Sequence, residues 1–291
     1  MATTGDGLVV VDKPAGLTSH DVVARVRRLA GTRRVGHAGT LDPMATGVLV
    51  LGVNRATRLL GHLALTEKAY DATIRLGATT VTDDADGEVL VTTSAASVTD
   101  EAVVAGLAAL TGAIEQVPSA VSAVKIDGKR SYKRVREGEQ VELPPRPVTV
   151  HELTPVATRR DGDFVDVDVR VVCSSGTYVR AIARDLGAAL GVGGHLTALR
   201  RTRVGPYDLS LAHTLDELAE SFALLPIAEA ARSAFPARDV GEDEAKVVSH
   251  GGPLASVGAG AGPVAVFAPD GTFLALVEER GATTKAVAVF V

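Results

Sequence analysis

The residues best suited to chemistry lie in a glycine-rich run, GHAGTLDPMATGVL, at residues 36–49. Pro43 restricts the preceding Asp42 to extended conformations, and the glycines allow close backbone approach or a positive φ. The sequence therefore predicts one carboxylate fixed at a loop tip. That carboxylate suits a nucleophile or an acid/base group, but Asp before Pro is also common in Asx-type turns, so the spacing alone leaves both interpretations open.

Two further features bear on metal and redox chemistry. The acidic run DDADG at residues 83–87 lacks the alternating ligands and the later Glu of an EF-hand, so we interpret it as a polar turn. The single cysteine, Cys173, excludes an internal disulfide framework and a Cys-based zinc site. We expect neither a bound metal nor a cofactor.

These candidate residues must be positioned by strands and helices. Apolar and alternating runs predict strands at residues 7–12, 48–53, 68–77 and 164–172. Helical spacing predicts a helix from an N-cap at Ser19 to a stop at Gly31, and others over residues 54–62, 100–110, 176–190 and 215–224. The order shows no regular βαβ period and no Gly-x-Gly-x-x-Gly motif opening a helix, which favours an α+β fold over a doubly wound one.

The C-terminal part of the chain differs in texture from the rest. From about residue 237, short Gly/Val/Ala-rich runs alternate with turn signals, which predicts a small β-rich domain. We therefore expect a catalytic domain at residues 1–234 and a second domain at residues 237–291. Inside the first, the basic segment 118–147 is bracketed by prolines and has no clean period, which indicates an exposed loop or hairpin.

The charge of the chain is unevenly distributed. The formal net charge over 291 residues is −5, which by itself counts against a nucleic-acid partner. Residues 76–124 hold seven acidic and no basic residues, and residues 204–291 hold twelve acidic and five basic ones. Residues 1–75, 125–147 and 170–203 are each net positive. The pattern predicts a one-sided basic cleft on an acidic protein.

Composition also limits the class of protein. Hydrophobic residues make up 46% of the chain and aromatic residues only 3%, which indicates a folded core of Val, Leu and Ala. The N-terminus lacks a basic stretch followed by a long apolar run, and no apolar run approaches the ~20 residues needed to cross a bilayer. We expect a cytoplasmic protein that does not contact membranes.

Five ordered blocks of the sequence resemble the TruB-type tRNA pseudouridine-55 synthases. The blocks are GLVVVDKPAGLTSHDVV, GHAGTLDPMATGVL, EKAYDATIRLGATTVTDDADGEV, PSAVSAVKIDGKRSYKRVREG, and CSSGTYVRAIARDLG followed by LRRTRVG. Together they cover about residues 7–205. The resemblance implies a pseudouridine synthase catalytic domain, with a mixed, largely antiparallel sheet flanked by helices, and a PUA-like RNA-binding domain at residues 237–291.

The resemblance also implies roles for single residues. Asp42 is the nucleophile of a cofactor-free isomerisation of a flipped-out uridine, and Arg180 is its partner cation. Tyr70 stacks on the target uracil and is the candidate for proton transfer, while Tyr178 and Leu199 line the pocket and His37 occupies the position that the uridine vacates. The resemblance implies that RNA is contacted by a thumb-like segment, which carries Lys125, Lys129, Arg130, Lys133, Arg134 and Arg136.

The expected function is isomerisation of uridine 55 in the T-arm loop of tRNA by a stand-alone monomer. One alternative is a guide-RNA-dependent relative, which the modest length and the missing lysine-rich tails disfavour. A second is a non-catalytic tRNA-binding or tRNA-folding protein, which predicts that Asp42→Asn leaves all function intact. A third, an aspartyl-nucleophile phosphotransferase, lacks support because no Asp-x-Asp or phosphate-binding loop accompanies Asp42.

Overall fold

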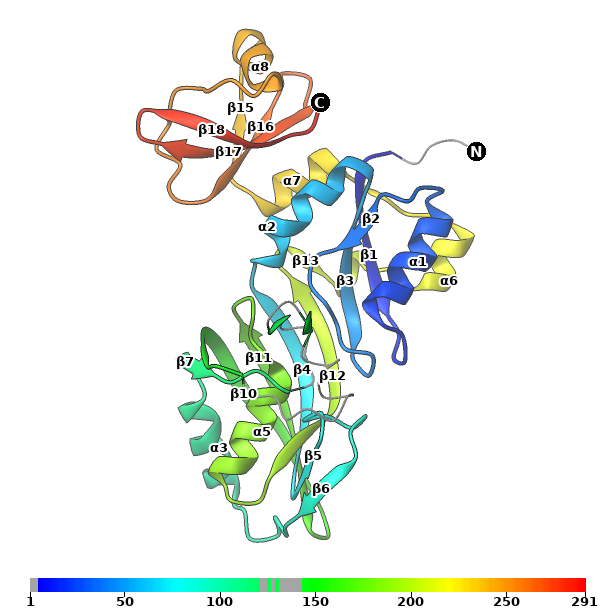
Figure 1. Ribbon diagram of the computed structural model, residues 1–291, viewed down its shortest axis with the longest axis vertical. Helices are drawn as coiled ribbons and strands as arrows, with labels where there is room; N and C mark the ends of the chain where they lie inside the picture. Colours follow the sequence, from blue (N-terminus) through cyan, green and yellow to red (C-terminus); the bar gives the residue numbers. More distant parts are fainter. Residues whose placement is uncertain (1–4, 121–124, 127–128, 131–142) are drawn as a thin grey trace.

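The computed structural model describes residues 5–120, 125–126, 129–130 and 143–291. Helices flank one large mixed sheet, and a four-stranded sheet follows at the C-terminal end (Figure 1). This arrangement confirms the predicted α+β class. Among the residues that the structure describes, no helix has the length and apolar character that a membrane span requires.

The large sheet is mixed and largely antiparallel, as expected, in the order β14-β1-β3-β12-β4-β11-β10-β7. Strands β3 and β12 pair in parallel, and β2 and β13 extend β3 and β12. The strands are β1 (Gly7–Lys13), β2 (Val35–His37), β3 (Thr46–Val53), β4 (Lys68–Leu76), β7 (Gly112–Gln116), β10 (Arg146–Asp161), β11 (Phe164–Cys173), β12 (Gly194–Val204), β13 (Tyr207–Asp208) and β14 (Leu225–Pro226).

The helices form two groups along the large sheet and a third near the C-terminal sheet. Helices α1 and α6 lie together beside β1, and α3 and α5 lie together near β10 and β11 (Figure 1). The helices are α1 (Ser19–Leu29), η1 (Asn54–Leu59), α2 (Leu60–Ala64), α3 (Asp100–Ala109), α5 (Val179–Ala189), η2 (Leu209–Leu211), α6 (Leu215–Glu220), α7 (Ile227–Ala234) and α8 (Glu242–Ser249).

Several details of the predicted helices are wrong, and one is that α5 begins at Val179, three residues later than expected. Thr18, not Ser19, caps α1, because the Thr18 hydroxyl accepts from Asp21 N while the Asp21 carboxylate accepts from Thr18 N. The helix expected over residues 54–62 divides into η1 and α2, and Asn54 does not cap it because Asn54 has a φ of +54°. Helix α6 ends at Glu220, four residues earlier than expected.

The predicted strands all form, but several strands escaped the sequence interpretation, and three of them are central to the large sheet or form its edge. These are β7, β10 and β12. Pro147 lies in β10 opposite Glu115, so the proline-bracketed segment ends inside a strand. Within that segment, the short strands β8 (Lys125–Ile126) and β9 (Lys129–Arg130) pair as a hairpin. A second small hairpin, β5 (Ala78–Thr80) with β6 (Val89–Thr92), follows β4.

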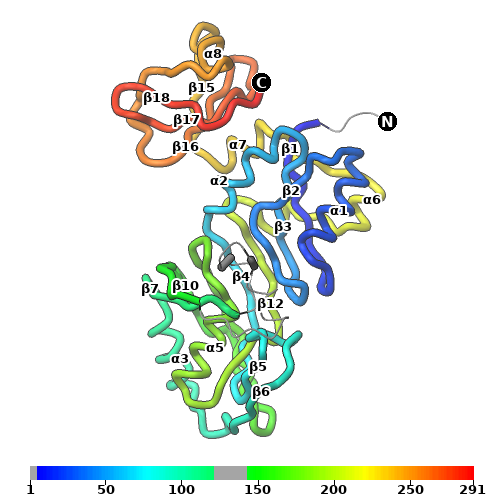
Figure 2. The backbone as a smooth tube through the Cα atoms, viewed as in Figure 1, coloured from blue at the N-terminus to red at the C-terminus, as the bar shows by residue number. Residues whose placement is uncertain are grey.

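The C-terminal sheet contains β15 (Ala237–Asp239), β16 (Pro263–Phe267), β17 (Phe273–Arg280) and β18 (Thr283–Val289), which confirms the β-rich texture. Its aromatic side chains Phe267, Phe273 and Phe290 share one buried cluster with Leu59 and Leu63 of the η1–α2 region. The Arg55 guanidinium also donates to the Phe290 carbonyl at 2.7 Å. The tube in Figure 2 shows this sheet seated beyond α2 and α7, so apolar packing joins it to the rest of the chain.

Candidate active site

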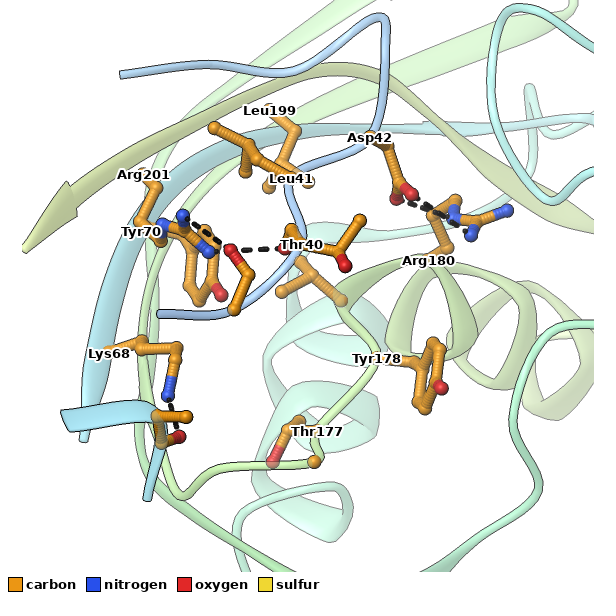
Figure 3. Close-up of a pocket in the computed structure, with 14 residues that line it drawn as sticks. Thr40, Leu41, Asp42, Lys68, Tyr70, Thr177, Tyr178, Arg180, Leu199 and Arg201 are labelled. Atoms are coloured by element: carbon orange, nitrogen blue, oxygen red, sulfur yellow. Dashed lines mark hydrogen bonds and ion pairs between the residues drawn. The ribbon is translucent and has the colours of Figure 1, made fainter. Parts of the chain in front are cut away.

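A cavity of about 280 Å³ lies beside the loop that carries Asp42. Its walls come from that loop, from β4, from the N-terminal end of α5 and from β12 (Figure 3). Five of the residues singled out from the sequence line it: Asp42, Tyr70, Tyr178, Arg180 and Leu199. The fold thus brings together residues that are up to 157 positions apart, between Asp42 and Leu199, around one space.

Arg180 joins two carboxylates in this cavity. Its Nε lies 3.0 Å from Asp42 Oδ2, and its Nη1 lies 3.4 Å from Asp84 Oδ2. Nη1 also donates to the Thr82 carbonyl at 2.7 Å. The side chains of Arg180 and Asp84 are each 6% exposed, whereas that of Asp42 is 33% exposed. Asp42 is therefore the member of the trio that can meet a ligand.

Asp84 belongs to the acidic run that the sequence presented as a plain polar turn. The turn is present, and Asp86 N donates to Asp84 Oδ1 at 3.1 Å. The Thr82 hydroxyl donates to the same carboxylate oxygen, and the Thr80 hydroxyl donates to the Asp84 carbonyl. These bonds fix a buried carboxylate behind Arg180, so the turn has a part in orienting the site.

The main chain of the Asp42 loop is anchored from three sides. From β1, the Lys13 ammonium donates to the Pro43 carbonyl at 3.2 Å. From α1, the Ser19 hydroxyl accepts from Leu41 N at 2.9 Å and donates to Leu41 O at 3.1 Å. From β12, Arg201 Nη1 and Nη2 donate to the carbonyls of Thr40 and Gly39, each at 3.3 Å. Because this loop is already ordered, substrate binding does not have to supply the conformational free energy that would fix the Asp42 carboxylate.

The parallel contact between β3 and β12 depends on Gly47. It has a φ of +98° and pairs with Arg201. A Cβ at this position would lie 2.2 Å from the Arg201 carbonyl oxygen. Glycine is thus required for the approach that places Arg201 against the Asp42 loop.

The two tyrosines of the cavity are held differently. Tyr70 is 7% exposed in β4, and its burial raises the pKa of its hydroxyl above the ordinary value, although Arg201 nearby opposes this shift. Tyr178 precedes α5, and its main chain is clamped by the buried Gln116 side chain, which accepts from Tyr178 N at 2.8 Å and donates to Tyr178 O at 3.1 Å. Tyr70 is therefore held by its burial in β4, and the main chain of Tyr178 is held by Gln116.

His37 does not line the cavity with the other predicted residues. It ends β2, and its ring packs edge-on against His20 with the ring centroids 5.6 Å apart. Burial lowers the pKa of His37 below its ordinary value, so the neutral imidazole predominates at neutral pH. Its Nδ1 is buried without a hydrogen-bond partner in the structure.

The predicted RNA-contacting residues fall in the least described part of the chain. Lys125, Lys129 and Arg130 belong to the β8–β9 hairpin, of which the backbone pairing alone is described. Lys133, Arg134 and Arg136 lie outside the described residues.

Sequence reasoning missed two cations of the cavity wall, Lys68 and Arg201. Lys68 is 7% exposed and Arg201 is 1% exposed. For Lys68 a signal was present, because it lies two residues before Tyr70 on a predicted strand and side chains two apart share a face. Arg201 lies on β12, which was not predicted. Over the described ranges, no group of three or more His, Cys, Asp or Glu side chains could hold a metal ion.

Models of known families match three consecutive parts of the chain. Residues 27–179 match the N-terminal domain of the TruB family pseudouridylate synthases. Residues 180–231 match the C-terminal domain of tRNA pseudouridylate synthase B, and residues 235–291 match the C-terminal part of tRNA pseudouridine synthase II.

Individual proteins give the same assignment. The tRNA pseudouridine synthase B of Thermobifida fusca is 64% identical over 289 residues, which cover 98% of each chain. That of Streptomyces griseus is 64% identical over 293 residues, with 99% of this chain and 98% of the relative covered.

Solved structures agree at lower identity. A Cbf5-Nop10-Gar1 complex contains a chain that is 28% identical, with a TM-score of 0.75 and coverage of 98% of this chain and 85% of the other. An H/ACA ribonucleoprotein bound to a substrate RNA containing 2′-deoxyuridine gives 25% identity and a TM-score of 0.73 at the same coverage. With its large mixed sheet, its cavity beside Asp42 and these matches along its length, the chain belongs to the TruB family of pseudouridine synthases.

Proposed function

We propose that this protein isomerises uridine 55 in the T-arm loop of tRNA to pseudouridine, with Asp42 as the nucleophile. The observation that carries the proposal is the partly exposed Asp42 carboxylate, held 3.0 Å from a buried arginine at the edge of a cavity that also contains two tyrosines. The 64% identical relatives named tRNA pseudouridine synthase B support tRNA as the substrate.

The reaction rearranges one glycosidic bond and needs no outside reactant. The uridine leaves its base stack and enters the cavity, because chemistry on a base inside a folded loop requires extrusion. Asp42 attacks the nucleoside, the C1′–N1 bond breaks, and the uracil turns until C5 bonds to C1′. The bond that Asp42 formed is broken again, so its carboxylate is regenerated. The C5 proton is then lost and N1 gains one, so the product is an isomer of the substrate.

The neighbours of Asp42 act by holding and orienting. Arg180 orients the Asp42 carboxylate through a charge-assisted contact at 3.0 Å. Tyr70 provides a stacking surface for the uracil, and Tyr178 and Leu199 close the cavity around it. In this proposal His37 fills the gap in the RNA, and the 118–147 segment grips the T-arm.

A stand-alone enzyme is favoured over a guide-RNA-dependent subunit. The relatives named as tRNA enzymes share 64% identity over nearly the whole chain, whereas the chains from the Cbf5 complex and the H/ACA ribonucleoprotein share 28% and 25%. We further propose that the protein acts as a monomer and that residues 237–291 form its PUA-like domain.

The test is to incubate the protein with an unmodified tRNA transcript and no other RNA, and then to map pseudouridine by chemical modification and primer extension. We expect one pseudouridine, at position 55, and none in a transcript that has cytidine at this position. Modification at another site would overturn the assignment of the target, and a requirement for a second RNA would favour the guide-dependent alternative.

A further inference from the structure

One buried cation in the cavity wall has no task in the reaction as described so far. Lys68 opens β4 and is 7% exposed. Its Nζ donates to the carbonyls of Ala64 at 2.9 Å and Thr66 at 2.8 Å. No carboxylate of the described residues lies within ion-pair distance of it. Burial of an ammonium that has only two neutral carbonyl acceptors costs free energy. Lys68 is therefore not explained by a contribution to folding stability.

Lys13, a second buried lysine, shows what a purely structural ammonium looks like here. Its Nζ donates to three carbonyls, those of Pro14, Leu17 and Pro43, at 2.9, 2.8 and 3.2 Å. An ammonium has three donors, so Lys13 is saturated. Lys68 uses two of its three N–H donors. Its side chain lines the same cavity as Tyr70 and Asp42.

The charge around Lys68 is positive. Of the charged groups near Lys68, Arg201 has the largest electrostatic effect on its pKa. Both cations line the cavity wall together with Tyr70 (Figure 3). The Arg201 guanidinium donates hydrogen bonds to the carbonyls of Gly39, Thr40 and Val48. Arg180 is shared by the two carboxylates of Asp42 and Asp84, so the wall that holds Lys68 and Arg201 is where an anionic group would be stabilised.

The reaction generates such a group. When the C1′–N1 bond breaks, its electron pair stays with the uracil, and the negative charge spreads over N1 and the two carbonyl oxygens. A fixed donor in a water-poor cavity stabilises developing charge of this kind far better than water does. Burial lowers the pKa of Lys68 to about 8, so at neutral pH the side chain is protonated in most molecules.

We infer that Lys68 donates its third N–H to a carbonyl oxygen of the detached uracil and stabilises the negative charge that forms when the glycosidic bond breaks. Lys68 keeps its protons throughout. The inference rests on the proposed function, and it makes Lys68 a catalytic residue with no role in gripping the tRNA backbone.

The test compares Lys68→Met and Lys68→Arg with wild type in single-turnover release of tritium from T-arm RNA labelled at uracil C5. Loss of one such donor should slow Lys68→Met about 100-fold. The dissociation constant for RNA should stay near the wild-type value, and Lys68→Arg should recover part of the rate. Lys246→Met, an exposed lysine of α8, is the control for loss of one positive charge.

A second substrate separates this role from a structural one. Fluorine at uracil C5 withdraws electrons and stabilises the uracil anion by itself, so the penalty of Lys68→Met should be smaller on RNA with 5-fluorouridine at the target. The measurement is single-turnover loss of the 5-fluorouridine after nuclease digestion and chromatography. A variant that is merely misfolded loses the same factor on both substrates.

The outcomes are separable. If wild type releases no tritium, the proposed function fails and the inference falls with it. If wild type is active and Lys68→Met matches it, or loses the same factor on both substrates, the inference alone is overturned.

Discussion

Arg180 lies between Asp42 and Asp84, and this arrangement decides which carboxylate is available for chemistry. The inner one, Asp84, is buried and accepts further hydrogen bonds from its own turn. The outer one, Asp42, faces the cavity, and among the described residues Arg180 is the side-chain cation within ion-pair distance of it. The planar guanidinium reaches both carboxylates and the Thr82 carbonyl with donors fixed in one plane, whereas an ammonium is a compact point charge without this fork geometry.

Arg180→Lys should therefore impair catalysis more than RNA binding. We expect the single-turnover rate to fall about 100-fold, because a fixed fork is replaced by a point charge. Arg232→Lys is a matched control, since Arg232 makes a similar fork with Asp239 on the surface of the protein. Parallel losses in rate and in RNA affinity would count against the pairing of Arg180 with Asp42 in the reaction.

The pH dependence of the reaction should report the charge of Lys68. Its lowered pKa of about 8 means that the ammonium is present below pH 8 and is lost as the pH rises through that value. We expect the wild-type single-turnover rate to decline above pH 8 and the decline to be shallower in Lys68→Arg, whose side chain stays charged.

The other groups that face Lys68 can be distinguished from it. Besides the Arg201 guanidinium, these groups are Cys173, whose pKa burial raises to about 11, and Tyr70, whose pKa is also raised. Lys13 also has a pKa of about 8, but it contacts loop carbonyls, and its contribution persists in Lys68→Arg. Superimposable profiles for the two proteins would show that Lys68 does not set the decline.

At the scale of elements, the loop of residues 38–45 is rigid because β1, α1 and β12 each bind its main chain. The sequence motif locates this loop, and the alternation of β4 correctly puts Tyr70 on the inner face. The partners could not be found from the sequence, since Arg201 reaches the loop only after β3 and β12 pair in parallel. Strands β10 and β12 were missed for a related reason, because neighbouring strands define them and their registers shift at bulges.

Gly47→Ala tests the close approach of β3 and β12. We expect a loss of about 3 kcal/mol or more in the free energy of unfolding, since the new Cβ meets the Arg201 carbonyl and φ is positive. Gly112→Ala is the control, because Gly112 also has a positive φ, +95°, but has open space around it, and it should lose only about 1 kcal/mol. Denaturant titrations measure both, and equal losses would contradict the requirement for close approach.

At the scale of the whole molecule, the larger of the two acidic stretches, residues 204–291, contributes none of the residues that line the cavity. Residues 204–291 carry twelve acidic residues, and arginines of this stretch pair with some of them, as Arg238 does with Glu244 and Arg280 with Glu278. The net charge of −5 therefore says little about the surface near Asp42. The shared aromatic cluster also means that the C-terminal sheet is packed against the η1–α2 region and not merely tethered to it.

Phe290→Ala tests this packing. Phe290 is 3% exposed, and its ring centroid lies 4.5 Å from that of Phe273. We expect a loss of about 3 kcal/mol and a single thermal transition that moves as a whole, because the cluster spans both sheets. Val291→Ala, at a 52% exposed neighbour, should change little. Two separate transitions in the wild-type protein would show that the sheets unfold independently.

The measurement that tests the central claim most directly is release of tritium from T-arm RNA labelled at uracil C5, with wild type and Asp42→Asn compared at equal RNA occupancy. Formation of the C5–C1′ bond must expel the label. We predict stoichiometric release by wild type and none above background by Asp42→Asn, with both proteins binding the RNA equally. Release by Asp42→Asn at the wild-type rate, or no release by either protein, would contradict the account.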